Sequence, residues 1–143
     1  MNQVKSERTG WRDENISRRH RLWGVACSAF DIDFLLIECD RCEPVAIIEY
    51  KAEYAKPQTF KMPQYRALKA LGDRAQLPVF SARYKMDFSY FTVTACNGLA
   101  QTYFKQKIMS ELEWVTFLYH LRDFDSLPLD IQNNINSKEP TNE

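Results

Sequence analysis

Two short apolar segments, Asp31-Ile-Asp-Phe-Leu-Leu-Ile37 and Val45-Ala-Ile-Ile-Glu-Tyr-Lys51, decide the fold class of this chain. Both are rich in the branched and aromatic residues that favour β-strands. The residues between them, 39–44, are polar and typical of a turn. Two such segments joined by about six residues indicate a β-hairpin.

Patterns of helix and strand alternate along the rest of the chain. Both hairpin strands are apolar on both sides, as in a sheet that lies between helices. The order helix, strand, strand, helix, strand, strand, helix therefore predicts an α/β fold, a mixed central β-sheet flanked by α-helices. We expect further strands over 79–84 and 90–95, and helices over 12–22, from Pro63 onward, and over 114–121 after the capping box Ser110-Glu-Leu-Glu113.

Length and composition indicate one globular domain. The chain has 143 residues, of which 45% are apolar and 27% are charged. These values exclude a disordered chain, a collagen-like chain and a small disulfide scaffold. We expect the domain to cover residues 1–125 and the polar residues 126–143 to form a mobile tail.

The sequence gives no sign of a membrane segment. No apolar run reaches the roughly 18 residues that are needed to cross a bilayer, and residues 1–12 carry no apolar secretion signal. We therefore expect a cytoplasmic protein whose four cysteines are reduced.

Charge is balanced overall but unevenly distributed. Residues 25–50 carry one arginine against six acidic residues, whereas residues 51–85 carry eight lysines or arginines against two acidic residues. An acidic cluster beside a basic surface suits a metal-dependent enzyme that acts on a polyanion. Charge alone favours the simpler interpretation, that these segments are solvated faces.

Acidic residues and one lysine lie inside the hairpin strands. Alternation puts Glu49 and Lys51 on one face of their strand and Tyr50 on the other. A hairpin that pairs Glu38 near Val45 brings Asp33 close to Tyr50 or Lys51. One face of the sheet is then expected to carry Asp33, Glu49 and Lys51 together.

Such a group has a chemical and a structural interpretation. Two carboxylates close together suit Mg²⁺ or Mn²⁺, which acidifies a bound water and neutralises the charge of a phosphate. A neighbouring lysine orients the attacking water or stabilises the developing charge. The structural interpretation is an ion pair at the end of a strand, with solvated aspartates at the start of the other strand.

These residues resemble the motif of the PD-(D/E)XK nuclease superfamily. Asp33 lies sixteen residues before the Glu49-Tyr-Lys51 segment, and a helix with Gln64 near its start follows. The order of elements from residue 12 to about residue 95 also resembles the superfamily core. The resemblance implies a restriction-endonuclease-like fold.

The resemblance also implies a role for each residue. Asp33 and Glu49 are metal ligands, and Lys51 is the catalytic lysine. Gln64 contacts water or phosphate, and Glu14 is an additional metal contact from the first helix. Asp31 is an alternative to Asp33, because both point to the same side of the strand. We prefer Asp33, which lies better opposite the Glu-Tyr-Lys segment.

Basic and aromatic residues are candidates for a nucleic-acid surface. Cations that neutralise phosphates and aromatic rings that stack on bases are the usual components of such a surface. For each aromatic residue, a place in the core is the more frequent alternative. The basic candidates are Arg18, Arg19, His20, Arg21, Lys56, Lys61 and Arg66, and the aromatic candidates are Trp11, Trp23, Tyr54 and Phe60.

The segment Cys39-Asp-Arg-Cys42 has the spacing of a zinc knuckle, and it lies at the expected hairpin turn. A complete zinc site also needs Cys27, Cys96 or His20, since there is no second pair with this spacing. As a redox motif it lacks a helix N-terminus that lowers a thiol pKa. Ordinary reduced thiols are therefore the first interpretation.

We expect a Mg²⁺- or Mn²⁺-dependent nuclease that hydrolyses phosphodiester bonds of DNA. The resemblance suggests processing of phage or other mobile-element DNA, by a homodimer or with partner proteins that supply specificity. The alternative is a catalytically inactive nuclease fold that binds DNA or protein. A third interpretation, a zinc-stabilised interaction domain, predicts zinc in the purified chain.

Overall fold

The computed structural model describes residues 14–27, 29–56 and 61–137. The chain divides into two compact units, residues 1–31 and residues 32–143, which we describe separately. The first unit contains helix α1 (Glu14–Leu22) and a short 3-10 turn, η1 (Val25–Cys27). No residue of α1 is buried. The expectation of one domain over residues 1–125 stays a prediction.

Five strands in the described part of the second unit form one sheet, and they follow each other in chain order across it. β2 and β3 are parallel, and the other neighbouring pairs are antiparallel. The predicted mixed sheet is therefore confirmed. The strands are β1 (Phe34–Glu38), β2 (Glu43–Ala52), β3 (Val79–Tyr84), β4 (Phe91–Ala95) and β5 (Gln106–Met109).

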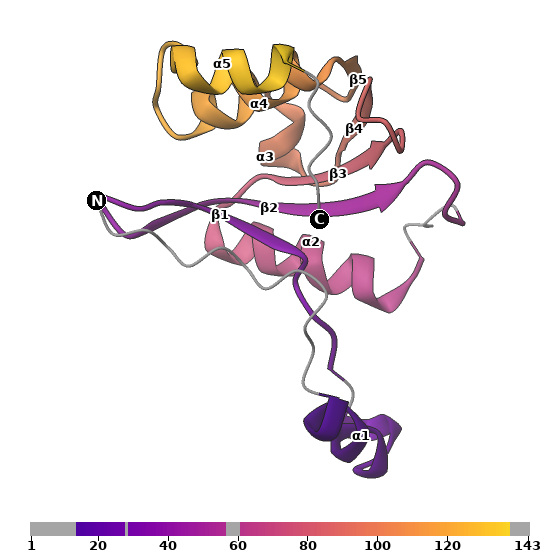
Figure 1. The fold of residues 1–143 in the computed structure, drawn as a ribbon. Helices are drawn as coiled ribbons and strands as arrows, with labels where there is room; N and C mark the ends of the chain where they lie inside the picture. Colours follow the sequence, from indigo (N-terminus) through magenta and orange to yellow (C-terminus); the bar gives the residue numbers. More distant parts are fainter. Residues whose placement is uncertain (1–13, 28, 57–60, 138–143) are drawn as a thin grey trace. The chain divides into compact units, whose positions relative to one another are not determined.

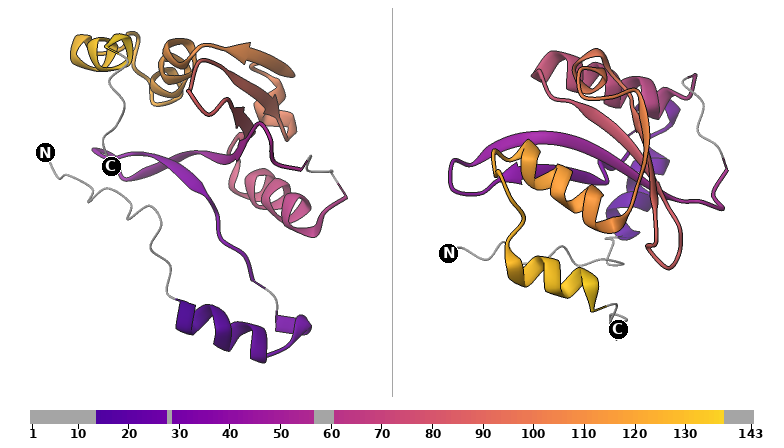
Figure 2. Two further views of the ribbon diagram at one scale, coloured as in Figure 1. Left: turned by 45° about the vertical axis from the view of Figure 1, so that its right-hand side comes forward. Right: turned by 90° about the horizontal axis from the view of Figure 1, so that it is seen from above.

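Helices cover both faces of this sheet (Figures 1 and 2). Helix α2 (Pro63–Ala75), which connects β2 to the parallel strand β3, lies on one face. Helices α3 (Gly98–Gln101) and α4 (Glu111–Leu121) lie on the other face, and α5 (Leu129–Asn136) packs beside α4. None of the described helices combines the length and the apolar character that crossing a membrane requires.

Two apolar clusters fill the space between the sheet and its helices. The α2 face of the sheet contributes Ile47 and Val79, which pack against Leu68 of α2. The α4 face contributes Ile48 and Phe80, among others, which pack with Trp114 of α4. Neighbouring residues of each strand thus serve different clusters, because side chains alternate between the faces of a sheet.

Two helices begin as the sequence predicts. Pro63 occupies the first turn of α2, where its missing N–H group costs nothing. At α4, the Ser110 hydroxyl accepts a hydrogen bond from the N–H of Glu113, and the Glu113 carboxylate accepts one from the N–H of Ser110. The capping box is therefore confirmed.

Other elements differ from the expectation. β1 begins at Phe34 rather than at Asp31, so both aspartates precede the strand. The expected polar tail contains helix α5, and the sequence pattern indicated neither α3 nor β5. α5 has no side-chain cap at its start, so the capping signal that marked α4 is missing there.

Candidate functional site

The β1–β2 hairpin places Glu49 next to the start of β1. Phe34, the first residue of β1, pairs with Ile48, and Leu35 pairs with Ile47. Asp33 directly precedes Phe34, in a bend outside the strand, and Glu49 directly follows Ile48. Extending the antiparallel register by one residue beyond the observed pairs would put Asp33 opposite Glu49. Glu49 itself shares the α2 face with Ile47, two residues before it.

This register corrects the sequence prediction, which paired Glu38 near Val45. In the structure Glu38 pairs with Glu43, and the register shifts between Leu36 and Ile37, so that Val45 is passed over. Such a bulge cannot be located from an alternation pattern alone. Its result is that Phe34, directly after Asp33, pairs with Ile48, directly before Glu49.

Lys51 lies beside Glu49 on the same face. Its Nζ is 3.5 Å from Oε1 of Glu49, and the Lys51 side chain is 38% exposed whereas the Glu49 side chain is 13% exposed. The intervening Tyr50 points to the opposite face and packs with the α4 cluster. The predicted alternation of the Glu-Tyr-Lys segment is therefore confirmed.

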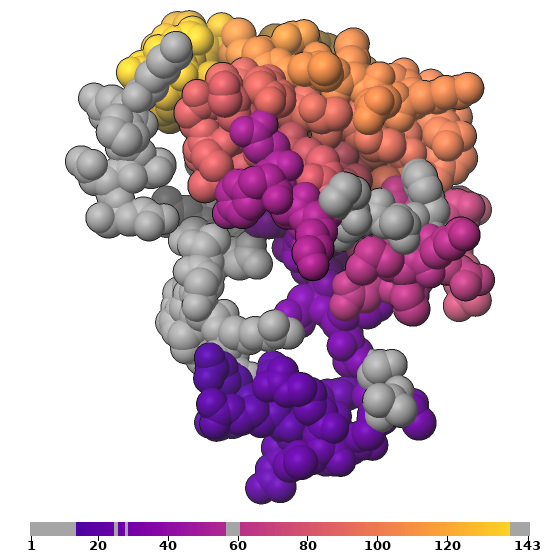
Figure 3. Space-filling model, turned by 90° about the vertical axis from the view of Figure 1, so that its right-hand side faces the viewer, coloured from indigo at the N-terminus to yellow at the C-terminus, as the bar shows by residue number. Residues whose placement is uncertain are grey.

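The next strand continues this polar surface. Glu49 pairs with Ser81, and Lys51 pairs with Arg83. The Arg83 guanidinium donates hydrogen bonds to the backbone carbonyls of Ala55, at 3.0 Å, and Lys56, at 2.9 Å. Arg83 thus anchors the segment that follows β2. Figure 3 shows this segment (magenta) against the salmon-coloured β3–β4 hairpin.

Tyr65 of α2 contacts Cys96, the residue that follows β4, and the charge of Glu49 acts on the Cys96 thiol. The Tyr65 hydroxyl donates a hydrogen bond to Sγ of Cys96. Burial raises the pKa of the Cys96 thiol, and the negative charge of Glu49 raises it further, whereas the hydrogen bond from Tyr65 lowers it. Burial is also the main cause of a raised pKa for Tyr65. The sequence indicated Tyr65 only as part of the apolar face of this helix.

Gln64 precedes Tyr65 in the first turn of α2 and is exposed. It follows Pro63, so its place at the start of the helix agrees with the position that the resemblance implies. Its proposed contact with water or phosphate stays a prediction.

Two candidate metal ligands belong to the N-terminal unit. Asp31 is the last residue of that unit and is exposed, and Glu14 opens α1. Glu14 pairs with Arg18 at 3.3 Å, and both side chains are largely exposed. Of the three acidic candidates that accompany Glu49, Asp33 is the one that belongs to the same unit as Glu49.

The basic candidates fall into two groups. Arg18, Arg19, His20 and Arg21 lie on α1 in the N-terminal unit. Lys56, Lys61 and Arg66 lie between the end of β2 and the first turns of α2, and all three are exposed. The second group therefore belongs to the same unit as Glu49 and Lys51.

The aromatic candidates are partly described. Trp23 is 55% exposed, and its ring centroid lies 4.9 Å from that of His20. A core position for Trp23 is therefore wrong. Tyr54 is 76% exposed and follows β2 closely. Trp11 and Phe60 lie outside the described residues.

Within the described residues, no group of three His, Cys, Asp or Glu side chains is arranged to hold a metal ion. Beside the first pair of the hairpin, Phe34 with Ile48, the chain offers two carboxylates, those of Asp33 and Glu49. This number suits Mg²⁺, which usually keeps several waters and takes one or two carboxylates from the protein. Cys39 and Cys42 are both exposed at the hairpin turn.

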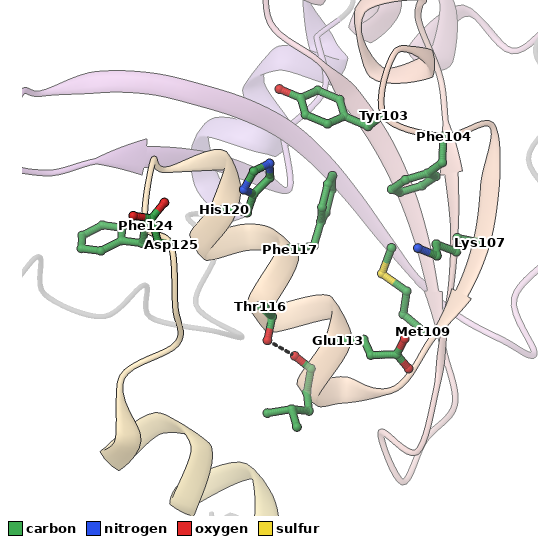
Figure 4. Close-up of a pocket in the computed structure, with 11 residues that line it drawn as sticks. Tyr103, Phe104, Lys107, Met109, Glu113, Thr116, Phe117, His120, Phe124 and Asp125 are labelled. Atoms are coloured by element: carbon green, nitrogen blue, oxygen red, sulfur yellow. Dashed lines mark hydrogen bonds between the residues drawn. The ribbon is translucent and has the colours of Figure 1, made fainter.

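A pocket of about 570 Å³ lies on the α4 side of the sheet, away from these residues. Figure 4 shows Phe117 and His120 of α4 facing Tyr103 and Phe104 across it. The rings of Phe104 and Phe117 are 5.2 Å apart, and charged residues, among them Lys107, Glu113 and Asp125, also line the pocket. It contains none of the site residues that the sequence predicts.

Comparisons with protein-family models, with curated proteins and with solved structures found no match for this chain. The geometry of Asp33, Glu49 and Lys51 is therefore the main basis for assigning a function.

Proposed function

We propose that the chain is a metal-dependent nuclease of the PD-(D/E)XK type, with a restriction-endonuclease-like fold, that hydrolyses phosphodiester bonds of DNA. The observation that carries this proposal is the Lys51–Glu49 pair, 3.5 Å apart on β2, beside the start of β1 that Asp33 directly precedes. Two carboxylates that hold a metal ion and one nearby ammonium group suit this chemistry.

The carboxylates fit Mg²⁺ or Mn²⁺, because both ions prefer hard oxygen ligands. Asp33 and Glu49 would hold the ion. When bound there, it would acidify a water molecule and neutralise negative charge on the phosphate. Glu49 is mostly buried, so its carboxylate has few rotamers to lose when it coordinates an ion.

Lys51 has a role that differs from that of the carboxylates. Its ammonium group is partly exposed, so it is able to reach both Glu49 and an incoming phosphate. It would orient the attacking water by a hydrogen bond and stabilise the charge that develops on the phosphate oxygens. Gln64, at the start of α2, would assist as a contact for water or phosphate.

The charges around these residues support DNA as the substrate. Lys56, Lys61 and Arg66 are exposed and follow the Glu-Tyr-Lys strand in the same unit. Cations of this kind bind phosphates without reading sequence. Sequence or structure preference would then come from a second copy or from a partner protein.

The direct test is a calorimetric titration of Mn²⁺ into the whole chain. We compare the wild type with Asp33→Asn and Glu49→Gln, which remove one carboxylate each but keep the side-chain size. Asp40→Asn, in the β1–β2 turn, is the matched control, and Asp31→Asn tests the alternative ligand. The proposal expects wild-type binding that both site variants lose and that Asp40→Asn and Asp31→Asn keep.

Equal binding in all five proteins, or loss in Asp31→Asn instead of Asp33→Asn, would contradict the assignment of these ligands. Circular dichroism checks that each variant is folded. A repeat with phosphorothioate DNA, which resists cleavage, covers the case in which the ion binds only together with substrate. If Mn²⁺ binds neither the chain alone nor the chain with phosphorothioate DNA, the alternative is favoured, an inactive nuclease fold that binds DNA or protein.

A further inference from the structure

Cys39 and Cys42 occupy the two ends of the connection between β1 and β2. The last pair of this hairpin is Glu38 with Glu43, and the cysteines are the first and last residues of the turn 39–42 that connects them. Both are exposed. They therefore face solvent from the two ends of one short turn.

The turn between the two cysteines is held in one conformation. The carboxylate of Glu38, which is only 3% exposed, accepts hydrogen bonds from the N–H groups of Asp40 and Arg41, at 3.3 and 2.8 Å. The Arg41 guanidinium in turn pairs with Glu43 and with Asp123, each at 3.1 Å. These contacts keep the cysteines close together without a covalent link.

The distances suit a disulfide. Sγ of Cys42 lies 3.5 Å from the backbone oxygen of Cys39, so the thiol of one cysteine already reaches the backbone of the other. Cys39 and Cys42 are the first and last residues of the four-residue turn. Such a tight turn brings its first and last Cα atoms within roughly 7 Å, and a disulfide needs roughly 4.4–6.8 Å. The turn is therefore compatible with a disulfide between them.

We propose that Cys39 and Cys42 are a redox-active thiol pair that a small disulfide, such as glutathione disulfide, converts reversibly into an intramolecular disulfide. One cysteine thiolate attacks a sulfur of glutathione disulfide and releases one glutathione thiolate, which leaves a mixed disulfide on the protein. The second cysteine thiolate then displaces the other glutathione. The pair loses two electrons, and one glutathione disulfide becomes two glutathione molecules.

The other cysteines lack these features. Cys96 is buried and accepts a hydrogen bond from Tyr65, and Cys27 belongs to the N-terminal unit. The proposal concerns the turn alone, so it does not depend on the proposed nuclease function. The bond would link the two ends of the hairpin turn, at the end of the hairpin opposite to Asp33 and Glu49.

Trypsin provides a specific assay, because it cleaves after Arg41, between the two cysteines. We incubate the whole chain with glutathione disulfide, block the remaining thiols with N-ethylmaleimide in acid-quenched, unfolded protein, and digest. In the oxidised chain the fragments 22–41 and 42–51 stay joined, and mass spectrometry detects them as one species. Dithiothreitol before blocking should separate them completely.

Fragment 22–41 also contains Cys27, so variants must identify the bond. The proposal expects the joined species in Cys27→Ser and its loss in both Cys39→Ser and Cys42→Ser. No joined species in the wild type would overturn the proposal. A joined species that survives in Cys39→Ser, or that occurs only in a disulfide-linked dimer on a non-reducing gel, would overturn it as well.

Discussion

The indole Nε1 of Trp114 donates a hydrogen bond to the hydroxyl of Tyr50 at 3.1 Å, and this bond joins α4 to the middle of the Glu-Tyr-Lys segment. The two rings also meet edge to face, with centroids 6.2 Å apart. Burial raises the pKa of the Tyr50 hydroxyl, and the bond from Trp114 opposes that rise. Because Tyr50 is fixed on the α4 face, Glu49 and Lys51 must project from the other face.

Removing the Tyr50 hydroxyl should destabilise the fold. Tyr50→Phe leaves the buried indole N–H without its partner, and an unpaired buried donor costs about 1–3 kcal/mol. Urea unfolding should therefore give a lower free energy of unfolding with an unchanged slope. Tyr54→Phe is the control, since Tyr54 is 76% exposed. Equal stabilities for the two variants would contradict this account of the contact.

Gly72 is required where α2 approaches β3. A Cβ atom at this position would lie 2.3 Å from Cγ2 of Val79 and 3.0 Å from the backbone oxygen of Leu77. Valine has little freedom to move aside. Gly72→Ala should therefore lower the free energy of unfolding by about 1–3 kcal/mol, although alanine favours a helix.

Gly98→Ala is the matched control for this substitution. A Cβ atom at Gly98, the first residue of α3, would meet nothing within 4 Å. We expect a stability equal to that of the wild type or slightly higher, by less than about 1 kcal/mol. Thermal and urea unfolding of both variants measure the difference. A Gly72→Ala variant with the stability of the wild type would mean that α2 and β3 are farther apart at Gly72 and Val79 than the structure shows.

The side chain of Asn97 connects three backbone groups and is almost fully buried. Its Oδ1 accepts hydrogen bonds from the N–H groups of Val79 and Ala100, and its Nδ2 donates one to the carbonyl of Leu77 at 2.8 Å. Asn97→Ala leaves these groups unpaired and should cost about 2–4 kcal/mol in urea unfolding. Asn134→Ala, at an exposed position, should cost much less.

Local signals in the sequence predicted the central elements well. β3 covers Val79–Tyr84, the predicted range, because Pro78 precedes a short branched and aromatic run. Pro63 and the Ser110–Glu113 box marked two helix starts through backbone chemistry that needs no partner. Such signals act within a few residues, so a single sequence contains them.

Features that depend on distant residues were not predictable in the same way. The bulge at Val45 sets which residues of β2 lie opposite the start of β1, and an alternation pattern does not locate a bulge. β5 was missed because only Met109 of its residues is buried, so it lacks an alternating pattern. The contact between Tyr65 and Cys96 joins residues 31 positions apart, and no spacing rule indicates it.

The pH dependence of stability should show the contribution of Glu38. The hydrogen bond from the backbone of Arg41 is the main reason that the pKa of Glu38 is lowered, with further contributions from Asp40 and Arg122. The folded state therefore favours the carboxylate. Its stabilising contribution is present above the ordinary pKa of 4.5 and is lost as the pH falls through the lower folded value.

The substitution Glu38→Gln tests whether the stabilising contribution of Glu38 is lost at low pH. The stability difference between wild type and Glu38→Gln should be largest at neutral pH and shrink as the solution is acidified, as measured by urea unfolding at several pH values. Glu111→Gln should behave in the opposite way, because burial raises the pKa of Glu111 and disfavours its charge. A difference for Glu38→Gln that stays constant down to acid pH would rule out a titrating contribution.

A substitution of Lys51 distinguishes the two proposed functions, a nuclease and a binding module. Lys51→Ala removes the positive charge 3.5 Å from Glu49 but leaves both carboxylates. If the proposed function holds, Mn²⁺ should bind at least as tightly as to the wild type, since a nearby cation opposes a second one. DNA cleavage should fall by roughly 10²-fold or more, because a group that stabilises transition-state charge is lost. Lys69→Ala, an exposed substitution on α2, controls for general loss of charge.

Cleavage is measured on single-stranded, duplex and branched DNA with Mn²⁺, and binding on the same substrates with a phosphorothioate backbone. Binding that survives in Lys51→Ala while cleavage disappears would support the enzyme, since only the chemical step then depends on this side chain. Binding without cleavage in the wild type, on every substrate, would instead indicate the module. Loss of Mn²⁺ binding in Lys51→Ala would mean that Lys51 positions Glu49, and the lysine would then have no separate catalytic role.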